Sequence, residues 1–230
     1  EQLSDTLNII NKTKKLMEIN KKKSHKLIDY KYAIKFMEKK VDQIIQQKSN
    51  ELIWFLTHND VYTCGTSAQK KEILKITNIP IISTNRGGKT TYHGKGQRIV
   101  YLMINLNNRK KDIRLFINIL EKTIHNLLYE LEIKSKSYKN RIGIWVTEVK
   151  GIKLKKEKKI GSIGLRIKKW VTFHGLSFNI CPNLSYYDNI VACGLENYET
   201  TSLKDLGIIL SDKEFDEKFA YHFLKEINKF

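Results

Sequence analysis

Four of the twelve glycines in this 230-residue chain lie within ten residues, in the stretch NRGGKTTYHGKGQ from Asn85 to Gln97. Glycine adopts positive φ angles freely and lets the backbone approach a ligand closely. The stretch separates two apolar segments that are typical of strands, so the chain must turn tightly here. A tight hairpin without a ligand needs one glycine pair. Two pairs, with Arg86 directly before the first and His93 directly before the second, favour a loop that directs backbone N–H groups into a pocket.

Hydrophobic periodicity predicts three helices among several strands. Apolar residues recur at helical spacing over 30–48 and over 113–131. Residues 211–228 form a third amphipathic segment, which opens with a capping box made by Ser211 and Glu214. Because the strands show no regular βαβ alternation, we expect a single α+β domain whose mixed sheet is covered by helices. The segments expected to contain strands are 51–56, 61–68, 79–84, 99–106, 141–146, 159–167 and 170–180.

Two segments are rich in lysine. Residues 1–29 include the charge run NKKKSHK and are expected to form a loosely held helix or tail. The catalytic domain is therefore expected to cover residues 30–230. The second segment, TEVKGIKLKKEKK, leads directly into Lys159 and is expected to be a polar, basic connection between two strands.

Composition excludes several classes of protein. The longest apolar runs, such as 52–56, are far too short to span a bilayer, and no secretory signal is evident. The three cysteines form no CxxC pair and have no zinc-like spacing with histidines, so no metal is expected. Their odd number favours a reducing compartment. A cytoplasmic location is expected, or an organellar one if a leader has been removed.

The net charge of +18 is compatible with acidic partners, including nucleic acids. Nucleic-acid binding is nevertheless not expected, because arginine is scarce and neither an RNP-like motif nor a basic helix with interleaved aromatic residues occurs. Much of the charge also has a compositional explanation, because AT-rich genomes encode many lysines on solvent-exposed surfaces.

Three blocks of the sequence together resemble one enzyme family. The blocks RGGKTTYHGKGQRIVYLMINL, KIGSIGLRIKKWVTFHGLSFNI and IVACGLENYETTSL resemble, in this order, the signatures of the lipoyl(octanoyl) transferases. The resemblance covers roughly residues 30–207 and implies a biotin/lipoyl-ligase-like catalytic fold. Three departures are Lys95 and Ala192, which replace family prolines, and THND at 57–60, which replaces a Glu-His-x-Pro-like stretch. The two lost prolines change the rigidity of loops beside the expected site.

The resemblance implies two catalytic residues. Cys193 aligns with the family's acyl-accepting cysteine, although a lone cysteine is more often a small buried hydrophobic residue. Lys159 aligns with the catalytic lysine; it opens an apolar strand, so its side chain can point inward, and Lys158 is the neighbouring alternative. A partly desolvated ammonium has a depressed pKa and can exchange protons with a thiol near neutrality. We expect Cys64 and Cys181 to be structural.

The resemblance also implies an acyl pocket lined by glycine-containing segments, which would let the backbone pack against a slender alkyl chain. His93 is placed at this pocket, whereas His174 is interpreted as a histidine at the edge of the core with structural hydrogen bonds. The expected substrate-binding residues are Arg86, Gly87, Gly88, Lys89, Thr90, Thr91, Tyr92, His93, Ser162, Ile163, Gly164, Gly175, Leu176 and Ser177.

The implied reaction is the first step of protein lipoylation. Cys193 takes an octanoyl group from octanoyl-acyl carrier protein, and a lysine of a lipoyl domain then receives it as an amide. The implied acceptors are the lipoyl domains of 2-oxoacid dehydrogenase complexes and the glycine cleavage H protein. Exchange of a thioester for a thioester is nearly thermoneutral and conversion to an amide is downhill, so neither ATP nor a cofactor is expected. Neither nucleic acid nor a membrane is an expected partner.

Three alternative functions stay open. An ATP-dependent lipoate–protein ligase shares the implied fold but needs no cysteine nucleophile, so the VACGL block argues against it. A catalytically inactive relative could bind lipoyl domains only, although Cys193 and Lys159 are both present. A basic nucleic-acid-binding module is the most distant alternative.

Overall fold

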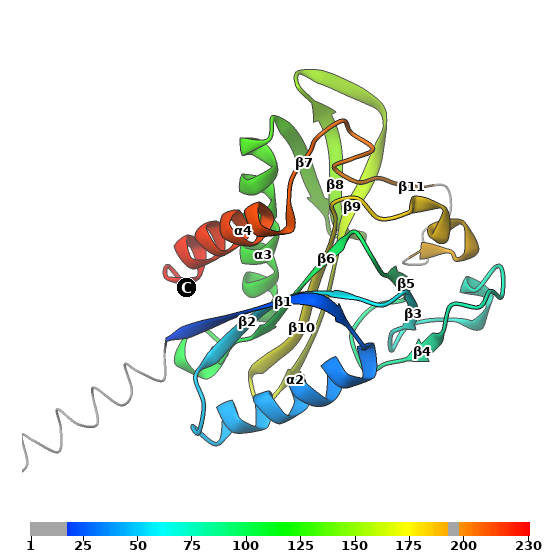
Figure 1. The fold of residues 1–230 in the computed structure, drawn as a ribbon. Helices are drawn as coiled ribbons and strands as arrows, with labels where there is room; N and C mark the ends of the chain where they lie inside the picture. The colour runs from blue at the N-terminus through cyan, green and yellow to red at the C-terminus, as the bar shows by residue number, and fades with distance from the viewer. Residues whose placement is uncertain (1–17, 193–197) are drawn as a thin grey trace, which may run out of the picture.

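The computed structural model describes residues 18–192 and 198–230. Within them, helix α2 covers one face of a large mixed sheet and helices α3 and α4 cover the other (Figure 1). This arrangement confirms the predicted α+β architecture. The helices are α2 (Tyr30–Ile45), α3 (Ile113–Glu130) and α4 (Asp212–Ile227), with short 3₁₀ turns η1 (Lys70–Glu72), η2 (Leu106–Asn108) and η3 (Leu184–Asn189).

The large sheet has the strand order β1-β2-β6-β10-β9-β8-β7, with β11 paired to β9, and a small sheet has the order β4-β3-β5. Pairs β1–β2, β9–β11 and β3–β4 are parallel and the others are antiparallel. The strands are β1 (Ile19–Ile28), β2 (Glu51–His58), β3 (Val61–Cys64), β4 (Ile81–Ser83), β5 (Thr90–His93), β6 (Gln97–Met103), β7 (Ile133–Tyr138), β8 (Arg141–Val149), β9 (Ile152–Lys168), β10 (Val171–Asn179) and β11 (Glu199–Thr200).

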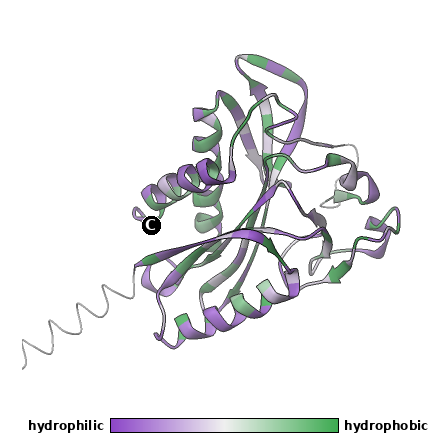
Figure 2. Ribbon diagram, viewed as in Figure 1, coloured by the Kyte–Doolittle hydropathy of each residue, from purple (hydrophilic) through white to green (hydrophobic). Residues whose placement is uncertain are grey.

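Strand β6 is an interior strand of the large sheet, between β2 and β10, and is buried on both faces. Because successive side chains of a strand point to opposite faces, Val100 and Leu102 pack toward α3 and α4, whereas Tyr101 and Met103 pack toward α2. The central strands are accordingly hydrophobic, whereas β1 is largely hydrophilic (Figure 2). No helix in the described ranges is both long and apolar enough to cross a membrane.

The predicted helices are confirmed, and side-chain caps define their first residues. Asp29 accepts a hydrogen bond from the Tyr32 amide at the start of α2. At the start of α4 the predicted capping box is present: the Ser211 hydroxyl accepts from the Glu214 amide, and the Glu214 carboxylate accepts from the Ser211 amide. Such caps satisfy backbone N–H groups that have no partner within the helix.

The interpretation of residues 1–29 as a loosely held helix or tail is wrong for residues 19–28, which form strand β1 of the large sheet. This edge strand pairs in parallel with β2. The Lys22 ammonium lies 4.5 Å from the Phe36 ring centroid, and the Trp54 indole donates to the Ser24 hydroxyl. Backbone pairing and such polar contacts hold β1 in the sheet. Its residues show no regular alternation of apolar and polar side chains, so the sequence pattern did not predict a strand here. Lysines on an edge strand also discourage pairing with other chains.

Two other predictions about loops are wrong. The segment 147–158 is a continuous hairpin of β8 and β9 rather than a connection. Its turn residues Lys150 and Gly151 have φ angles of +48° and +80°, the left-handed conformations that tight hairpin turns require. In the glycine-rich stretch, the expected polar loop contains strand β5, whose four residues are buried in the small sheet.

Candidate active site

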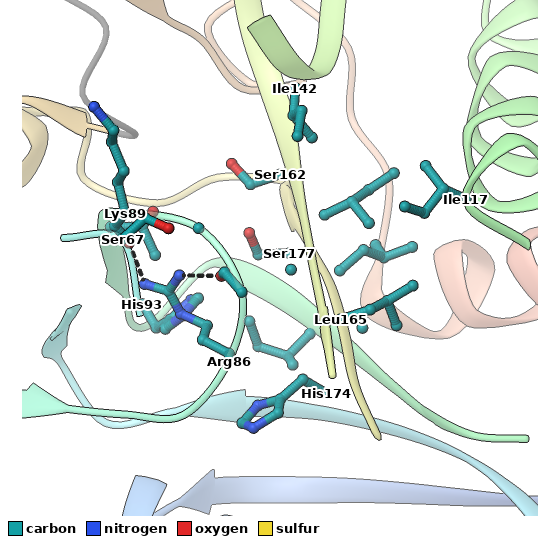
Figure 3. Close-up of a pocket in the computed structure, with 18 of the residues that line it drawn as sticks. Ser67, Arg86, Lys89, His93, Ile117, Ile142, Ser162, Leu165, His174 and Ser177 are labelled. Atoms are coloured by element: carbon teal, nitrogen blue, oxygen red, sulfur yellow. Dashed lines mark hydrogen bonds between the residues drawn. The ribbon is translucent and has the colours of Figure 1, made fainter. Parts of the chain in front are cut away.

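A cavity of about 520 Å³ lies between the glycine-rich loop and strands β9 and β10 (Figure 3). Its size is within the usual range for small-molecule sites. Twelve of the predicted substrate-binding residues line it, and their contact with a substrate stays a prediction. These twelve are Arg86, Gly87, Gly88, Lys89, Thr91, His93, Ser162, Ile163, Gly164, Gly175, Leu176 and Ser177.

The other two predicted residues, Thr90 and Tyr92, do not line the cavity. They lie on the opposite face of β5 from Thr91 and His93, because side chains alternate along a strand. The Tyr92 hydroxyl donates to Asp60 Oδ1 at 2.7 Å. The same carboxylate oxygen also accepts from the Lys95 amide at 3.4 Å, a bond that a proline at position 95 could not donate. Two of the departures from the family pattern, Asp60 and Lys95, therefore contact each other.

Arg86 shapes the loop that forms one wall of the cavity. Its guanidinium donates to the carbonyl oxygens of Thr63 at 2.7 Å, of Lys89 at 2.7 Å and of Gly87 at 2.9 Å. The Thr63 hydroxyl accepts two further bonds from it. These contacts close the loop around a buried cation. Arg86 therefore holds the backbone of this loop in place, and each of its three guanidinium nitrogens donates to the protein itself.

Small residues keep the opposite wall open. Ser162 pairs with Ser177 and Gly164 pairs with Gly175 across β9 and β10. A Cβ atom at Gly175 would lie 2.0 Å from the Val100 carbonyl oxygen, so only glycine fits there. The aliphatic part of the lining comes from α3, β6, β8, β9 and β10. It comprises Ile99, Ile113, Ile117, Ile142, Ile163, Leu165 and Leu176.

Lys159 lies on the cavity wall with only 6% of its surface exposed. Its ammonium donates to the Ile142 carbonyl oxygen at 2.9 Å and lies 5.6 Å from the Trp145 ring centroid. Lys158 points the other way, with Nζ 3.2 Å from a Glu199 carboxylate oxygen. The structure therefore brings Lys159, rather than its neighbour, to the cavity.

Cys193 lies outside the described residues, but Ala192, which precedes it directly, is described. Ala192 and Lys159 line the same small cavity of about 10 Å³, together with Ser162 and Ser177. Such a volume is on the order of that needed to hold one water molecule. On the far side of the undescribed segment, the Tyr198 ring lies 5.0 Å from that of Trp145. The residues that flank the segment therefore lie around Lys159.

Neutral polar groups form another part of the cavity wall, where Tyr30, Tyr101 and His174 join His93. Burial lowers the pKa of His174 to about 3 and holds that of His93 well below its ordinary value. Both imidazoles are therefore uncharged at neutral pH. His174 makes the predicted structural hydrogen bond, to Asn85 at 3.1 Å, but it also lines the cavity. Among described residues its Nδ1 has no partner.

Comparison with known proteins relates this arrangement to lipoylation. Residues 29–224 match the family described as the lipoyl protein ligase A/B catalytic domain. An octanoyltransferase of Wolbachia pipientis wMel is 45% identical over 203 residues, which cover 88% of this chain and 96% of that protein.

Two solved structures show the same fold at low sequence identity. The bipartite lipoate protein ligase of Thermoplasma acidophilum, studied with its E2 lipoyl domain, superposes with a TM-score of 0.64 at 13% identity, covering 92% of this chain and 84% of that one. The biotin acetyl coenzyme A carboxylase synthetase of Helicobacter pylori superposes with a TM-score of 0.53 at 11% identity, covering 91% and 75%. The predicted biotin/lipoyl-ligase-like fold is therefore confirmed.

Proposed function

This chain belongs to the octanoyltransferase family with the lipoyl protein ligase A/B catalytic domain, and we propose that it carries its octanoyl group on Cys193 between donor and acceptor. The proposed donor is octanoyl-acyl carrier protein. The proposed acceptor is a lysine of a lipoyl domain, as in 2-oxoacid dehydrogenase complexes or the glycine cleavage H protein.

One observation carries the proposal: a buried lysine ammonium lies on the wall of a partly aliphatic cavity. Lys159 reaches this cavity and also the small cavity lined by Ala192. Because Cys193 is bonded directly to Ala192, this supports a pairing of the Cys193 thiol with the Lys159 amine. The aliphatic side chains of Ile117, Leu165 and Leu176 supply a surface on which burial of each CH₂ group of an acyl chain is worth about 0.8 kcal/mol.

In the first half of the proposed reaction, the Cys193 sulfur attacks the thioester carbon of the acyl carrier. A new C–S bond forms and the carrier's C–S bond breaks. Lys159 accepts the thiol proton and returns it to the departing carrier thiolate. The acyl group is then held as a thioester of Cys193.

In the second half, the neutral amine of the acceptor lysine attacks the enzyme's thioester carbon. A C–N bond forms and the bond to Cys193 breaks. Lys159 takes a proton from the attacking amine and passes it to the departing thiolate. Because an amide is more stable than a thioester, the reaction proceeds without ATP.

The ATP requirement tests this function against a ligase of the same fold. We expect purified protein to transfer octanoate from octanoyl-acyl carrier protein to a lipoyl domain at the same rate with or without MgATP. Apyrase treatment serves as the control for carried-over nucleotide, and the product is measured by the mass of the lipoyl domain. Attachment of free lipoate that depends on ATP, without transfer from the carrier, would instead identify a ligase.

The β8–β9 hairpin is the proposed docking surface for an acidic carrier protein. Lys153, Lys155 and Lys156 are exposed along it, and β9 continues from them directly to Lys159. Lys158 is excluded from this surface, because it already pairs with Glu199. A cluster of one charge sign beside an active site raises the rate of encounter with partners of opposite charge.

Charge reversal tests the docking surface. We expect the triple variant Lys153→Glu/Lys155→Glu/Lys156→Glu to raise the KM for octanoyl-acyl carrier protein about tenfold or more. The KM of this variant should also depend less on salt concentration, because less electrostatic attraction is left for the salt to screen. The matched control reverses three exposed lysines of α2, Lys31, Lys35 and Lys39, with the same change in net charge. Equal effects of the two triple variants would assign the attraction to net charge instead of the hairpin.

A further inference from the structure

We propose that Gly143 is a positioning residue, whose missing side chain provides the space in which Lys159 reaches the active site. The inference rests on the proposed role of Lys159 in acyl transfer. Gly143 lies in β8, one residue after Ile142, whose carbonyl oxygen accepts the hydrogen bond from the Lys159 ammonium. It is absent from the residues that line the large cavity, so we expect its effect on the reaction to act through Lys159.

The space beside Gly143 is filled by the Lys159 side chain. A Cβ atom built on Gly143 would lie 2.4 Å from Lys159 Cε and 3.0 Å from its Nζ. It would also lie 2.9 Å from the carbonyl oxygen of Gly161. A real Cβ atom does not approach other atoms so closely, so even an alanine methyl group would need the lysine to move. The Lys159 side chain therefore crosses β8 through the space that the missing side chain of Gly143 leaves open.

The backbone of both strands is adapted to this crossing. Gly143 has a φ angle of +138°, a conformation that is essentially restricted to glycine. The pairing between β8 and β9 shifts here: Ile144 pairs with Gly161, but Trp145 pairs with Lys159, which leaves one extra residue on β9. Such β-bulges re-aim side chains and are frequent beside active sites. Glycine and bulge together direct the ammonium to the Ile142 carbonyl oxygen.

The consequence for the reaction is geometric. Proton transfer requires the lysine nitrogen to lie about 2.6–3.2 Å from the atom that loses the proton. A displacement of about 1 Å, caused by a residue that does not touch the substrate, is enough to reduce a rate about 100-fold. A methyl group at position 143 would displace Nζ and strain the backbone near Gly161, whereas the exposed lysines of the β8–β9 hairpin lie nearer its turn. The carrier's binding should therefore change far less than the rate.

The test compares two glycines that both have positive φ angles. Gly143→Ala should lower kcat about 10- to 100-fold and change the KM for octanoyl-acyl carrier protein by less than about twofold. Gly207→Ala is the matched control, since Gly207 has a φ angle of +74° in a turn before α4, outside the cavity lining and the β8–β9 hairpin, and has nothing within 4 Å of an added Cβ atom. We expect it to keep kcat within about twofold of the unmodified protein. Equal losses of kcat in both variants would overturn the proposal.

A double-mutant cycle separates positioning from general structural damage. Lys159→Ala removes Cε and Nζ, so the added methyl group no longer meets them. In single-turnover measurements at excess enzyme, Gly143→Ala should then lower the residual rate by less than about twofold, and the melting temperature should fall less than it does when Lys159 is present. An equal loss of rate in both backgrounds would show that Gly143 does not act through Lys159.

The cycle also covers the remaining outcomes. If Gly143→Ala alone does not fold, Gly143→Ala/Lys159→Ala should fold, but it should melt below Lys159→Ala because the strained φ angle and the contact with the Gly161 carbonyl oxygen remain. Failure of both variants to fold would overturn the proposal. If Lys159→Ala keeps full activity, the proposed role of Lys159 fails, and with it the proposed effect of Gly143 on the rate. The melting temperatures would still report whether the two residues compete for the same space.

Discussion

We expect the Cys193→Ala variant to acquire no octanoyl group when it is mixed with octanoyl-acyl carrier protein, whereas the unmodified protein gains the mass of one. The reason is that the proposed first half of the reaction stores the acyl group as a thioester, which alanine cannot form. Intact-mass spectrometry of the protein, quenched in acid before the lipoyl domain is added, measures the adduct directly. Transfer to a lipoyl domain should be lost in the same variant.

Cys64 and Cys181 provide matched controls, because both are free thiols in the described part of the chain. Cys64 is half-buried in the small sheet, with its sulfur 3.7 Å from the Thr90 hydroxyl, and Cys181 is exposed at the end of β10. We expect Cys64→Ala and Cys181→Ala each to keep the single adduct. An adduct that persists in Cys193→Ala but disappears in Cys181→Ala would assign the nucleophile to the exposed thiol and contradict the proposal.

Lys159→Ala should lower the rate of octanoyl transfer about 1,000-fold, within the 10²- to 10⁴-fold range typical of a positioned acid or base. A loss of that size corresponds to about 4 kcal/mol in the activation free energy. Lys159→Arg should be nearly as defective, because a guanidinium does not give up its proton at neutral pH. Both adduct formation and transfer to the lipoyl domain should slow, since Lys159 serves each half of the proposed reaction.

Lys158→Ala is the control for this variant, because Lys158 is the adjacent lysine and pairs with Glu199 outside the cavity. We expect it to keep the transfer rate within about twofold. The residual rate of Lys159→Ala should rise with pH toward about 8.5, the ordinary pKa of a cysteine, since the thiol must then ionise without help. A Lys159→Ala variant with an unchanged rate would remove this lysine from the mechanism.

The neutral histidines beside the cavity complement this assignment. Burial lowers the pKa of His58 to about 4, and that of His174 to about 3. His58 is tied to its surroundings by hydrogen bonds to the Ile28 carbonyl and the Tyr101 hydroxyl. Because these imidazoles stay uncharged at neutral pH, they make the surroundings of the cavity polar but do not provide a second group that takes up protons near neutral pH. The histidines on the cavity wall are therefore less suited than Lys159 to accept a proton in the proposed reaction.

The sequence by itself determined the helices and the central strands. Helix α3 and helix α4 follow from residues that recur every three or four positions, such as Phe116 with Leu120 and Phe215 with Phe219, all of which are buried. Local periodicity is enough for these elements, because each depends on residues close together in the chain. The resemblance of the motif blocks to a known family, rather than periodicity, implied Lys159 and the twelve predicted residues that line the cavity.

Only the tertiary structure decided which partners those residues meet. Strand β1 is held by backbone pairing to β2, which leaves no hydrophobic period in its sequence. Arg86 lines the cavity, as expected, but only the structure shows that its guanidinium also donates to the carbonyl oxygens of Thr63 in β3 and of Lys89 in its own loop. The space that Gly143 leaves for Lys159 depends on strand register and on a bulge. These features join residues through sheet pairing across the fold, and a one-residue shift in register would undo each of them.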